Sequence, residues 1–321
     1  MHLTLIAHWL SMISRVIHNI WVVLMPSVYA KYYYRKVTNK KLNLKNPRDY
    51  NEKVQWLKIY SDTSPWTELA DKYKVREYVK NCGLGQILVK LYGVWERAEE
   101  IDYDVLPGSF VLKANNGCGN NILVYDKSSM DIHQTNKTIN HWFKEDNSLI
   151  SFQPHMWNIV PRIIAEELLQ LENISKQYKS LVDYKFYCFH GQPEFIDVIF
   201  DRKNQVLGLE IEAADYYRRE NVYDLKWNKM VDVLANPSQY DMVVDLPRPQ
   251  MLNEMIEICK ILSRPFSQVR VDLYEVNGHV YFGELTFTPG GLNDFTTEFL
   301  IKMGEKIDLS TARLRKRLFI I

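Results

Sequence analysis

Two acidic side chains near the carboxyl end of the chain are placed to share a metal ion. Asp272 and Glu284 lie in VRVDLYEVNGHVYFGELTFTPGG (residues 269–291), where two apolar runs flank Asn277-Gly278. Asn-Gly is a strong hairpin signal, and the hairpin brings Asp272 and Glu284 together. Carboxylate oxygens suit magnesium. Arg270 shares the face of Asp272, where it can hold a phosphate or a developing oxyanion.

The opposite face of this hairpin is predicted to be apolar, which leaves the charged face to line a site. We expect Val269, Val271, Leu273, Tyr281 and Leu285 on that apolar face. The alternative interpretation is a surface hairpin whose charges only pair across the strands.

A glycine-rich loop lies between two apolar runs in SFVLKANNGCGNNILVYDK, residues 109–127. Gly117 and Gly119 let backbone N–H groups close on an anion, and Lys113 ends the first run where it can reach a phosphate. The loop is not a Walker A motif, because no Gly-Lys-Ser/Thr opens a helix, and the three-glycine dinucleotide fingerprint is also missing. An ordinary hairpin is the alternative. Cys118 is interpreted as a small loop residue rather than a nucleophile.

A third element is IIAEELL, residues 163–169, followed by Asp183-Tyr184-Lys185. Backbone next to an apolar run can pair with an adenine edge, and a carboxylate can bind ribose hydroxyls. The signal is weak alone, because Glu-Glu at a strand-to-helix boundary is common.

The elements that must position these residues alternate between helices and strands, which predicts an α/β or α+β chain. The apolar spacing predicts helices over residues 48–60, 67–83 and 251–262, the second ending at the C-cap glycine Gly83. Strands are expected over residues 86–92, 109–113, 121–125, 181–189, 269–274 and 280–285. Residues 159–171 are expected to be helical toward their end.

The composition is that of a globular protein. The 321 residues suit one large domain or two lobes around a cleft, and 46% hydrophobic with 25% charged residues excludes a disordered or collagen-like chain. Four scattered cysteines without a CxxC pair argue against a zinc ribbon or a disulfide scaffold. Reduced thiols in the cytoplasm are therefore expected.

The charge is distributed unevenly along the chain. Residues 1–48 contain eight Lys and Arg and no Asp or Glu, whereas the remaining 273 residues contain 32 basic and 39 acidic ones. A basic arm on an acidic body does not indicate a nucleic-acid binder, whose whole domain is usually basic.

The first thirty residues are largely apolar, but Arg15 and His18 interrupt them. A membrane-spanning helix is therefore disfavoured. A secretory signal peptide is not indicated either, because it would start with a positively charged region. Trp21 and Tyr32-Tyr33-Tyr34 lie among Lys31, Arg35, Lys36, Lys40, Lys41 and Lys45. This mixture suits the headgroup layer of an anionic membrane, so residues 1–48 are expected to contact the inner face of the cytoplasmic membrane. The alternative is an amphipathic helix packed on the body, followed by a solvated basic loop.

The order of the motifs resembles the ATP-grasp superfamily and, more narrowly, the TupA-like ATP-grasp group of cell-surface polysaccharide and teichuronopeptide biosynthesis. The resemblance is carried by DKYKVR, LPGSFVLKANNGCGNN, IIAEELL, DYKFYCFHG, VRVDLY and FGELTFTPGG, and covers residues 46–308. It implies an α+β fold of two lobes that enclose ATP, with the glycine-rich hairpin over the phosphates.

The resemblance also implies roles for residues on the nucleotide side. Lys72 and Lys113 match the two phosphate-side lysines, and Gly117 and Gly119 match the phosphate-covering loop. Glu166, Glu167 and Leu168 fall at the adenine hinge. Asp183 falls where a ribose-binding acid usually lies, and Lys185 looks similar to a further nucleotide-side lysine.

On the metal side, Asp272 and Glu284 match the magnesium-binding acids, and Arg270 matches the arginine that steadies an acyl phosphate. Thr286 departs from the superfamily pattern, which usually has Asn there. Its hydroxyl can still coordinate Mg2+, more weakly. By resemblance, the catalytic residues are Arg270 and Lys113.

The function implied is that of an ATP-dependent carboxylate-amine ligase that forms an acyl phosphate and modifies a surface polysaccharide with an amino acid or peptide. The resemblance divides the chain into an arm (1–45), an N-terminal region (46–108), a small lobe (109–165) and a large lobe (166–321). An ATP-grasp sugar kinase is one alternative. A glycosyltransferase is another, since Asp102-Tyr103-Asp104 has the spacing of its metal motif, although it is expected to be an exposed turn. His155 and His190 are interpreted as structural.

Overall fold

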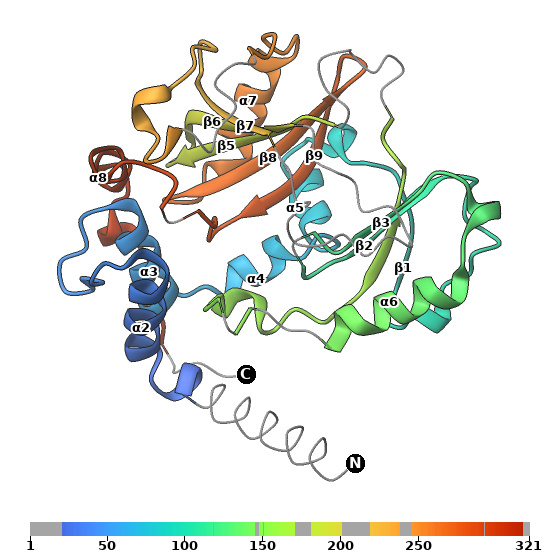
Figure 1. Ribbon diagram of the computed structural model, residues 1–321, viewed down its shortest axis with the longest axis horizontal. Coiled ribbons are helices and arrows are strands. Elements are labelled where there is room, and N and C mark those ends of the chain that lie inside the picture. Colours follow the sequence, from blue (N-terminus) through green and yellow to red (C-terminus); the bar gives the residue numbers. More distant parts are fainter. Residues whose placement is uncertain are drawn as a thin grey trace.

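Two antiparallel sheets and the helices around them form the body of the molecule (Figure 1). The computed structural model describes residues 21–117, 119–144, 148–149, 151–170, 181–200, 219–237, 245–291 and 293–316. Cys118 and the first twenty residues, with Arg15 and His18, lie outside them. The described helices are α2 (Pro26–Thr38), α3 (Tyr50–Tyr60), α4 (Ser64–Ala70), α5 (Val75–Asn81), α6 (Ile132–Lys144), α7 (Leu252–Ser263) and α8 (Thr297–Glu305).

The smaller sheet has the strand order β1-β4-β2-β3. Its strands are β1 (Leu91–Trp95), β2 (Phe110–Ala114), β3 (Asn121–Val124) and β4 (Ile163–Glu166). Leu112 of β2 and Ile139 of α6 are fully buried in one apolar cluster, which fixes the helix against the sheet. The β2–β3 hairpin carries the glycine-rich loop.

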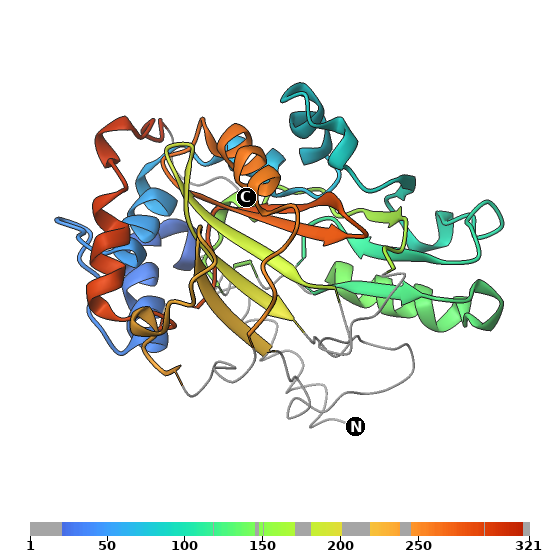
Figure 2. The ribbon, with the colours of Figure 1, turned by 90° about the horizontal axis from the view of Figure 1, so that it is seen from above.

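The larger sheet has the order β7-β6-β5-β8-β9. Its strands are β5 (Asp183–Phe189), β6 (Gln192–Phe200), β7 (Arg219–Asp224), β8 (Val269–Val276) and β9 (His279–Thr286). Helix α7 packs on β5, β6 and β8, as Figure 2 shows from above. The core between them contains Phe186, Val271 and Leu262. The opposite face of this sheet carries the charged side chains Lys185, Asp272 and Glu284, and Lys72 connects Glu284 to the glycine-rich loop of the smaller sheet.

Most predicted elements of the large sheet are confirmed. Strands β5, β8 and β9 and helix α7 lie within one to three residues of the expected bounds. Asn277 and Gly278 form the hairpin turn with φ values of 53° and 75°, the left-handed pair that Asn-Gly favours. Val269, Val271, Leu273 and Leu285 are buried as predicted.

The prediction for Tyr281 was wrong, because a bulge at Gly283 shifts the register of β9. Glu284 pairs with Asp272, whereas Leu273 pairs with Phe282, so one residue of β9 is extra. Phe282 is therefore the residue in the apolar core, and Tyr281 pairs with Tyr274 instead.

Three other expectations also need correction. The helix expected over residues 67–83 is divided into α4 and α5, because the Asp71 carboxylate accepts hydrogen bonds from the N–H groups of Tyr73 and Lys74 and starts a new turn. Residues 85–87 form a 3-10 turn, and the strand begins only at Leu91. The helix expected toward the end of residues 159–171 is not found in the described part of this segment: residues 163–166 form β4, which β1 and β2 bind from both sides, and residues 167–170 have no regular structure.

The N-terminal region packs beside the two sheets. Helix α3 begins at the N-cap Asp49, whose carboxylate accepts a hydrogen bond from Glu52 N, and it packs on α8. Tyr29 and Tyr34 of α2 are buried against Phe152 and Leu44. No helix among the described residues is long and apolar enough to cross a membrane. The three predicted segment boundaries at residues 45, 108 and 165 stay predictions, although β1 lies in the same sheet as β2 to β4.

Candidate active site

A row of four ionisable side chains crosses the inner face of the larger sheet. Asp197 of β6 pairs with Lys185 of β5, Lys185 pairs with Asp272 of β8, and Asp272 pairs with Glu284 of β9. Directly paired residues on neighbouring strands point to the same face. The expected approach of Asp272 and Glu284 is thus observed, and Lys185 joins them.

Asp272 lies at the centre of this row and is saturated with hydrogen bonds. Arg270 donates from Nε to Oδ1 and from a terminal nitrogen to Oδ2, both at 2.7 Å, and Lys185 Nζ also donates to Oδ2. Only 2% of Asp272 is exposed. A bidentate guanidinium and an ammonium compensate the cost of burying this carboxylate.

Lys185 is held between two carboxylates. Its Nζ lies 2.9 Å from Asp183 Oδ2 and also contacts Asp272. Burial alone would lower the pKa of Lys185, but Asp183 and Asp272 raise it above its ordinary value. Burial likewise opposes the charge of Arg270, and Asp272 more than offsets this, so that its pKa is raised well above normal. Both cations therefore stay charged.

Glu284 is the more accessible of the two predicted metal-binding acids, with 30% of its side chain exposed. Lys72 Nζ donates to Oε2 at 3.0 Å, and the Thr286 hydroxyl donates to Oε1 at 3.0 Å. Arg270 lies 3.5 Å from the same carboxylate and also donates to the Thr286 hydroxyl at 3.1 Å. Burial raises the pKa of Glu284, but Lys72, Lys185 and Arg270 outweigh it and hold the pKa well below its ordinary value.

Lys72 connects the two sheets. It lies in the turn between α4 and α5, where its N–H donates to Asn115 O at 3.0 Å. Its Nζ also donates to Gly117 O at 2.9 Å. Because Gly117 lies in the glycine-rich loop and Glu284 in the larger sheet, this lysine is placed where both parts of the predicted site meet.

The glycine-rich loop has the backbone geometry that its glycines allow. Gly119 has a φ of +78°, and a Cβ on Gly117 would lie 2.8 Å from the side chain of Asn120. Asn115 is fully buried, donates to Val160 O and accepts from Arg162 N, which anchors the loop to the start of β4. The contact of Gly117 and Gly119 with phosphates stays a prediction.

The predicted hinge region is only partly available to a nucleotide. Glu166 ends β4, and its carboxylate accepts hydrogen bonds from Lys113 at 2.9 Å and from Arg76 at 2.8 Å. Glu167 N donates to Lys90 O at 2.9 Å, so this amide is used within the protein. Glu167 is exposed and Leu168 half-buried. The hinge role of residues 166–168 stays a prediction.

Three further residues of this region did not emerge from the sequence. Arg76 binds Glu166, and Asp197 and Glu220 lie diagonally on β6 and β7, on the face of Lys185. Burial and then the neighbouring Glu220 raise the pKa of Asp197 well above its ordinary value. Alternation along β6 carried a usable signal, because Asp197 is the only acid in the middle of an apolar strand. No sequence pattern indicated the role of Arg76, because its partner Glu166 lies ninety residues away.

The other polar candidates lie outside this network. Asp102 and Asp104 are exposed, and Asp102 accepts a hydrogen bond from the N–H of Asp104, so the pair forms a turn. His155 is buried against Trp66 and Phe287, and burial lowers its pKa to about 3. His190 adopts a φ of +47° in the β5–β6 turn.

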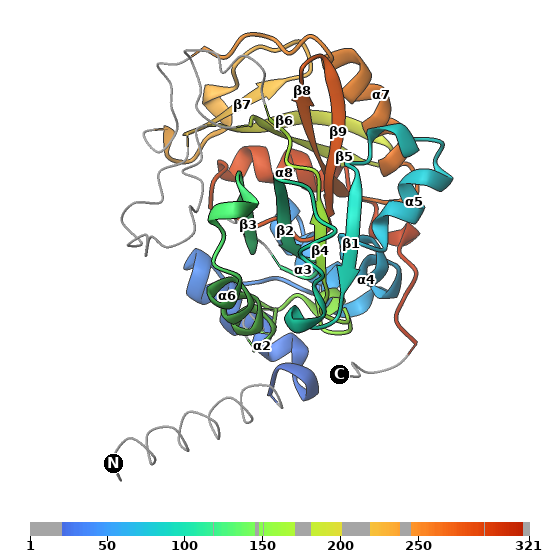
Figure 3. The same ribbon diagram turned by 90° about the vertical axis from the view of Figure 1, so that its right-hand side faces the viewer.

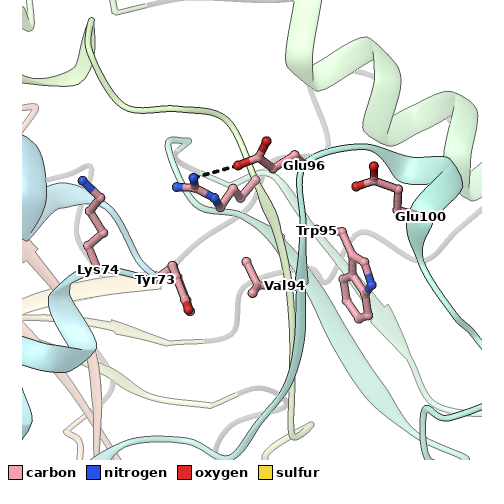
Figure 4. A pocket seen from close by; sticks show the side chains of 7 residues that line it. Tyr73, Lys74, Val94, Trp95, Glu96 and Glu100 are labelled. Carbon is pink, nitrogen blue, oxygen red and sulfur yellow. Dashed lines mark hydrogen bonds and ion pairs between the residues drawn. The ribbon is translucent and has the colours of Figure 1, made fainter.

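A surface pocket lies beside β1 (Figure 4). It is lined by Tyr73, Lys74, Val94, Trp95, Glu96, Glu100 and Arg162. Arg162 and Glu96 form an ion pair of 2.8 Å across it. None of the predicted site residues lines this pocket.

The comparison with family models agrees with the resemblance that the motifs show. A family model described as TupA-like ATPgrasp matches residues 52–308. No curated protein matches the sequence.

Among solved structures, D-alanine–D-alanine ligase from Bacillus anthracis is similar at 13% identity with a TM-score of 0.41, over 80% of this chain and 65% of that one. D-alanyl-alanine synthetase A from Vibrio cholerae O1 biovar eltor is similar at 9% identity with a TM-score of 0.43, over 79% and 68%. The ATP-grasp ligase PsnB, complexed with a precursor variant, Mg and ADP, is similar at 11% identity with a TM-score of 0.39, over 77% and 61%. The chain thus spans about two thirds of the length of these proteins.

Proposed function

The chain belongs to the TupA-like ATP-grasp family and has the ATP-grasp fold, and from this premise we propose that it is an ATP-dependent carboxylate-amine ligase. The reaction proposed has two steps. A substrate carboxylate oxygen attacks the γ-phosphorus of ATP and releases ADP, and an amine nitrogen then attacks the acyl phosphate carbon and releases phosphate.

The observation that carries the proposal is the convergence of three cations on Asp272 and Glu284, beside the glycine-rich loop. Lys72 links the glycine-rich loop to Glu284, and Lys185 and Arg270 lie beside Asp272 on the larger sheet. Phosphoryl transfer requires positioned charge more than covalent chemistry by the protein. These three cations supply that charge, and no covalent protein intermediate is needed.

The predicted residues with charged side chains have distinct parts in this proposal. Lys72 and Lys113 bind ATP phosphates, and Arg270 stabilises the charge that develops on the acyl phosphate. Asp183 contacts the ribose from the start of β5. Because Arg270 is fixed by Asp272 in bidentate geometry, its guanidinium is already oriented when substrate binds.

The donor set of the predicted metal site fits Mg2+. Asp272, Glu284 and Thr286 carry hard oxygen atoms, and Glu284 is partly exposed. Asp272 would have to exchange a hydrogen bond with Arg270 or Lys185 for the ion. No group of three His, Cys, Asp or Glu side chains in the described part of the chain could hold a metal by itself. This agrees with Mg2+, which commonly takes one or two carboxylates and completes its shell with substrate phosphates and water. When bound, the ion would neutralise phosphate charge.

We further propose that the substrates are a uronic acid of a surface polysaccharide, or its precursor, and an amino acid or peptide. The family's association with surface polysaccharides supports this assignment. A sugar kinase with the same fold differs in its acceptor alone, so the experiment must separate the two. The exposed turn of Asp102 and Asp104 provides no support for a glycosyltransferase.

The test measures ADP and free phosphate separately. Purified protein is given ATP, Mg2+, a glucuronate-type sugar and a pool of amino acids. We expect both products, with dependence on the carboxylate and the amine together. Lys113→Ala should abolish them, whereas the exposed Lys80→Ala should not.

Other outcomes would refute the ligase. ADP release with phosphate retained on the sugar would identify a kinase. Absence of ATP turnover together with binding of a nucleotide-sugar and manganese would identify a transferase.

A further inference from the structure

The solvent-facing side of α2 combines apolar and basic side chains. At 100° per residue, Val28 and Tyr32 fall at the centre of this side, and Lys31, Arg35 and Lys36 flank them. Val28 is 47% and Tyr32 49% exposed, and the three bases are also exposed. We call these five residues the α2 outer face.

The opposite side of the helix fixes this face to the body. Tyr29, Ala30 and Tyr34 are at most 2% exposed and pack with Leu42 and Phe152. The helix therefore has two apolar sides, and only one of them is covered by described residues. The expectation of a helix packed on the body is correct for the inner side, and the outer side remains available.

The charge around the α2 outer face is of one sign. Residues 1–48 contain no acid, and Lys40, Lys41 and Lys45 follow the helix as exposed bases. None of Lys31, Arg35 and Lys36 forms an ion pair within the part of the chain that the structure describes. Leu24, 71% exposed, extends the apolar centre toward the N-terminus. Figures 1 and 3 both place α2 at the lower edge of the molecule, away from the larger sheet.

We propose that the α2 outer face binds the surface of an anionic phospholipid bilayer. Val28, Tyr32 and Leu24 would enter the headgroup layer, and the flanking bases would contact lipid phosphates. A nucleic acid fits less well, because its phosphate backbone gains nothing from the apolar centre. This proposal goes beyond the ligase activity and does not depend on it.

The experiment is sedimentation of the full-length protein with phosphatidylcholine vesicles that contain or lack phosphatidylglycerol. Binding is expected only with the anionic vesicles and is expected to weaken at high salt. The triple variant Lys31→Gln, Arg35→Gln, Lys36→Gln should lower the partition coefficient on the order of a hundredfold, since each base contributes about a factor of five. The matched control Lys80→Gln, Lys90→Gln, Lys226→Gln removes the same charge elsewhere and should bind as the wild type does.

A second variant tests the apolar centre. Leu24→Ser with Val28→Ser should weaken binding by about tenfold or more, because two exposed apolar groups no longer enter the bilayer. A thermal melt of each variant checks that it is folded. Retained binding by the basic triple variant, equal loss in the control, or equal binding to neutral vesicles would overturn the proposal. Sensitivity to the basic but not the apolar variant would indicate a polyanion site and also overturn it.

Discussion

Glu284 is the residue on which the proposed chemistry depends most directly, because it is the partly exposed carboxylate between Lys72, Arg270 and Thr286. Glu284→Gln keeps the size of the side chain and removes its charge. We expect turnover of ATP to fall by about a hundredfold or more, the scale seen when one charge-stabilising group is lost. Steady-state ADP release measures this, with the exposed Glu254→Gln as control. Full activity of Glu284→Gln would refute the assigned role.

Asp197 makes a prediction about pH. Its pKa is raised in the folded protein, so folding favours the protonated form. Stability is therefore lost as pH rises above about 3.9, the pKa of an unfolded Asp. Asp197→Asn cannot ionise and should avoid this loss, so its melting temperature should exceed that of the wild type at pH 8 and match it near pH 4. Thermal melts at both values test this, with the exposed Asp232→Asn as control. An equal difference at both pH values would contradict the assignment.

At this scale the sequence was most informative where the signal is local. The Asn277-Gly278 turn predicts the hairpin that joins the two strands, and this could be taken from the sequence. Its register alone would place Asp272 opposite Gly283, and the extra residue of the β9 bulge, which the sequence did not predict, brings Glu284 opposite Asp272. The pairing of Glu166 with Lys113 and Arg76 could not be predicted either, because it requires three separate elements to be placed.

At the scale of elements, the bulge in β9 sets the position of Glu284. A Cβ on Gly283 would lie 2.9 Å from the backbone oxygen of Asp272 and 3.0 Å from the ring of Tyr274. Gly283→Ala should therefore push β9 from β8, cost about 1–3 kcal/mol and lower turnover. Urea unfolding and ADP release measure the two effects. Gly108→Ala, whose Cβ meets nothing within 4 Å, is the control. Equal stability of the two variants would contradict this account of the bulge.

Helices and strands were predicted well where the apolar periodicity alone determines the type of element, as for α7 and β8. They were predicted poorly where tertiary contacts determine it. IIAEELL reads as a strand-to-helix boundary, and hydrogen bonds from β1 and β2 hold residues 163–166 as a strand, but no helix follows in residues 167–170. The division of α4 from α5 follows from one side chain, Asp71, in a segment whose apolar spacing continues through it.

At the scale of the whole molecule, the two sheets contribute opposite halves of the proposed site. The smaller sheet and its loop bring Lys113 and Gly117, and the larger sheet brings Lys185, Arg270 and Glu284. The α+β architecture with two lobes could be predicted from the order of the motifs, because each motif marks one part of a known fold. The relative orientation of the two sheets could not be predicted from the sequence, because composition and periodicity carry no information on how two sheets are oriented.

The measurement that tests the central claim most directly is trapping of the acyl phosphate. The protein is incubated with ATP, Mg2+ and a panel of uronic and amino acids, and hydroxylamine replaces the amine. We predict a hydroxamate in amounts equal to ADP, formed by the wild type and by Glu254→Gln but not by Glu284→Gln. ADP accompanied by a sugar phosphate that is stable to hydroxylamine, with no hydroxamate from any carboxylate, would contradict the account.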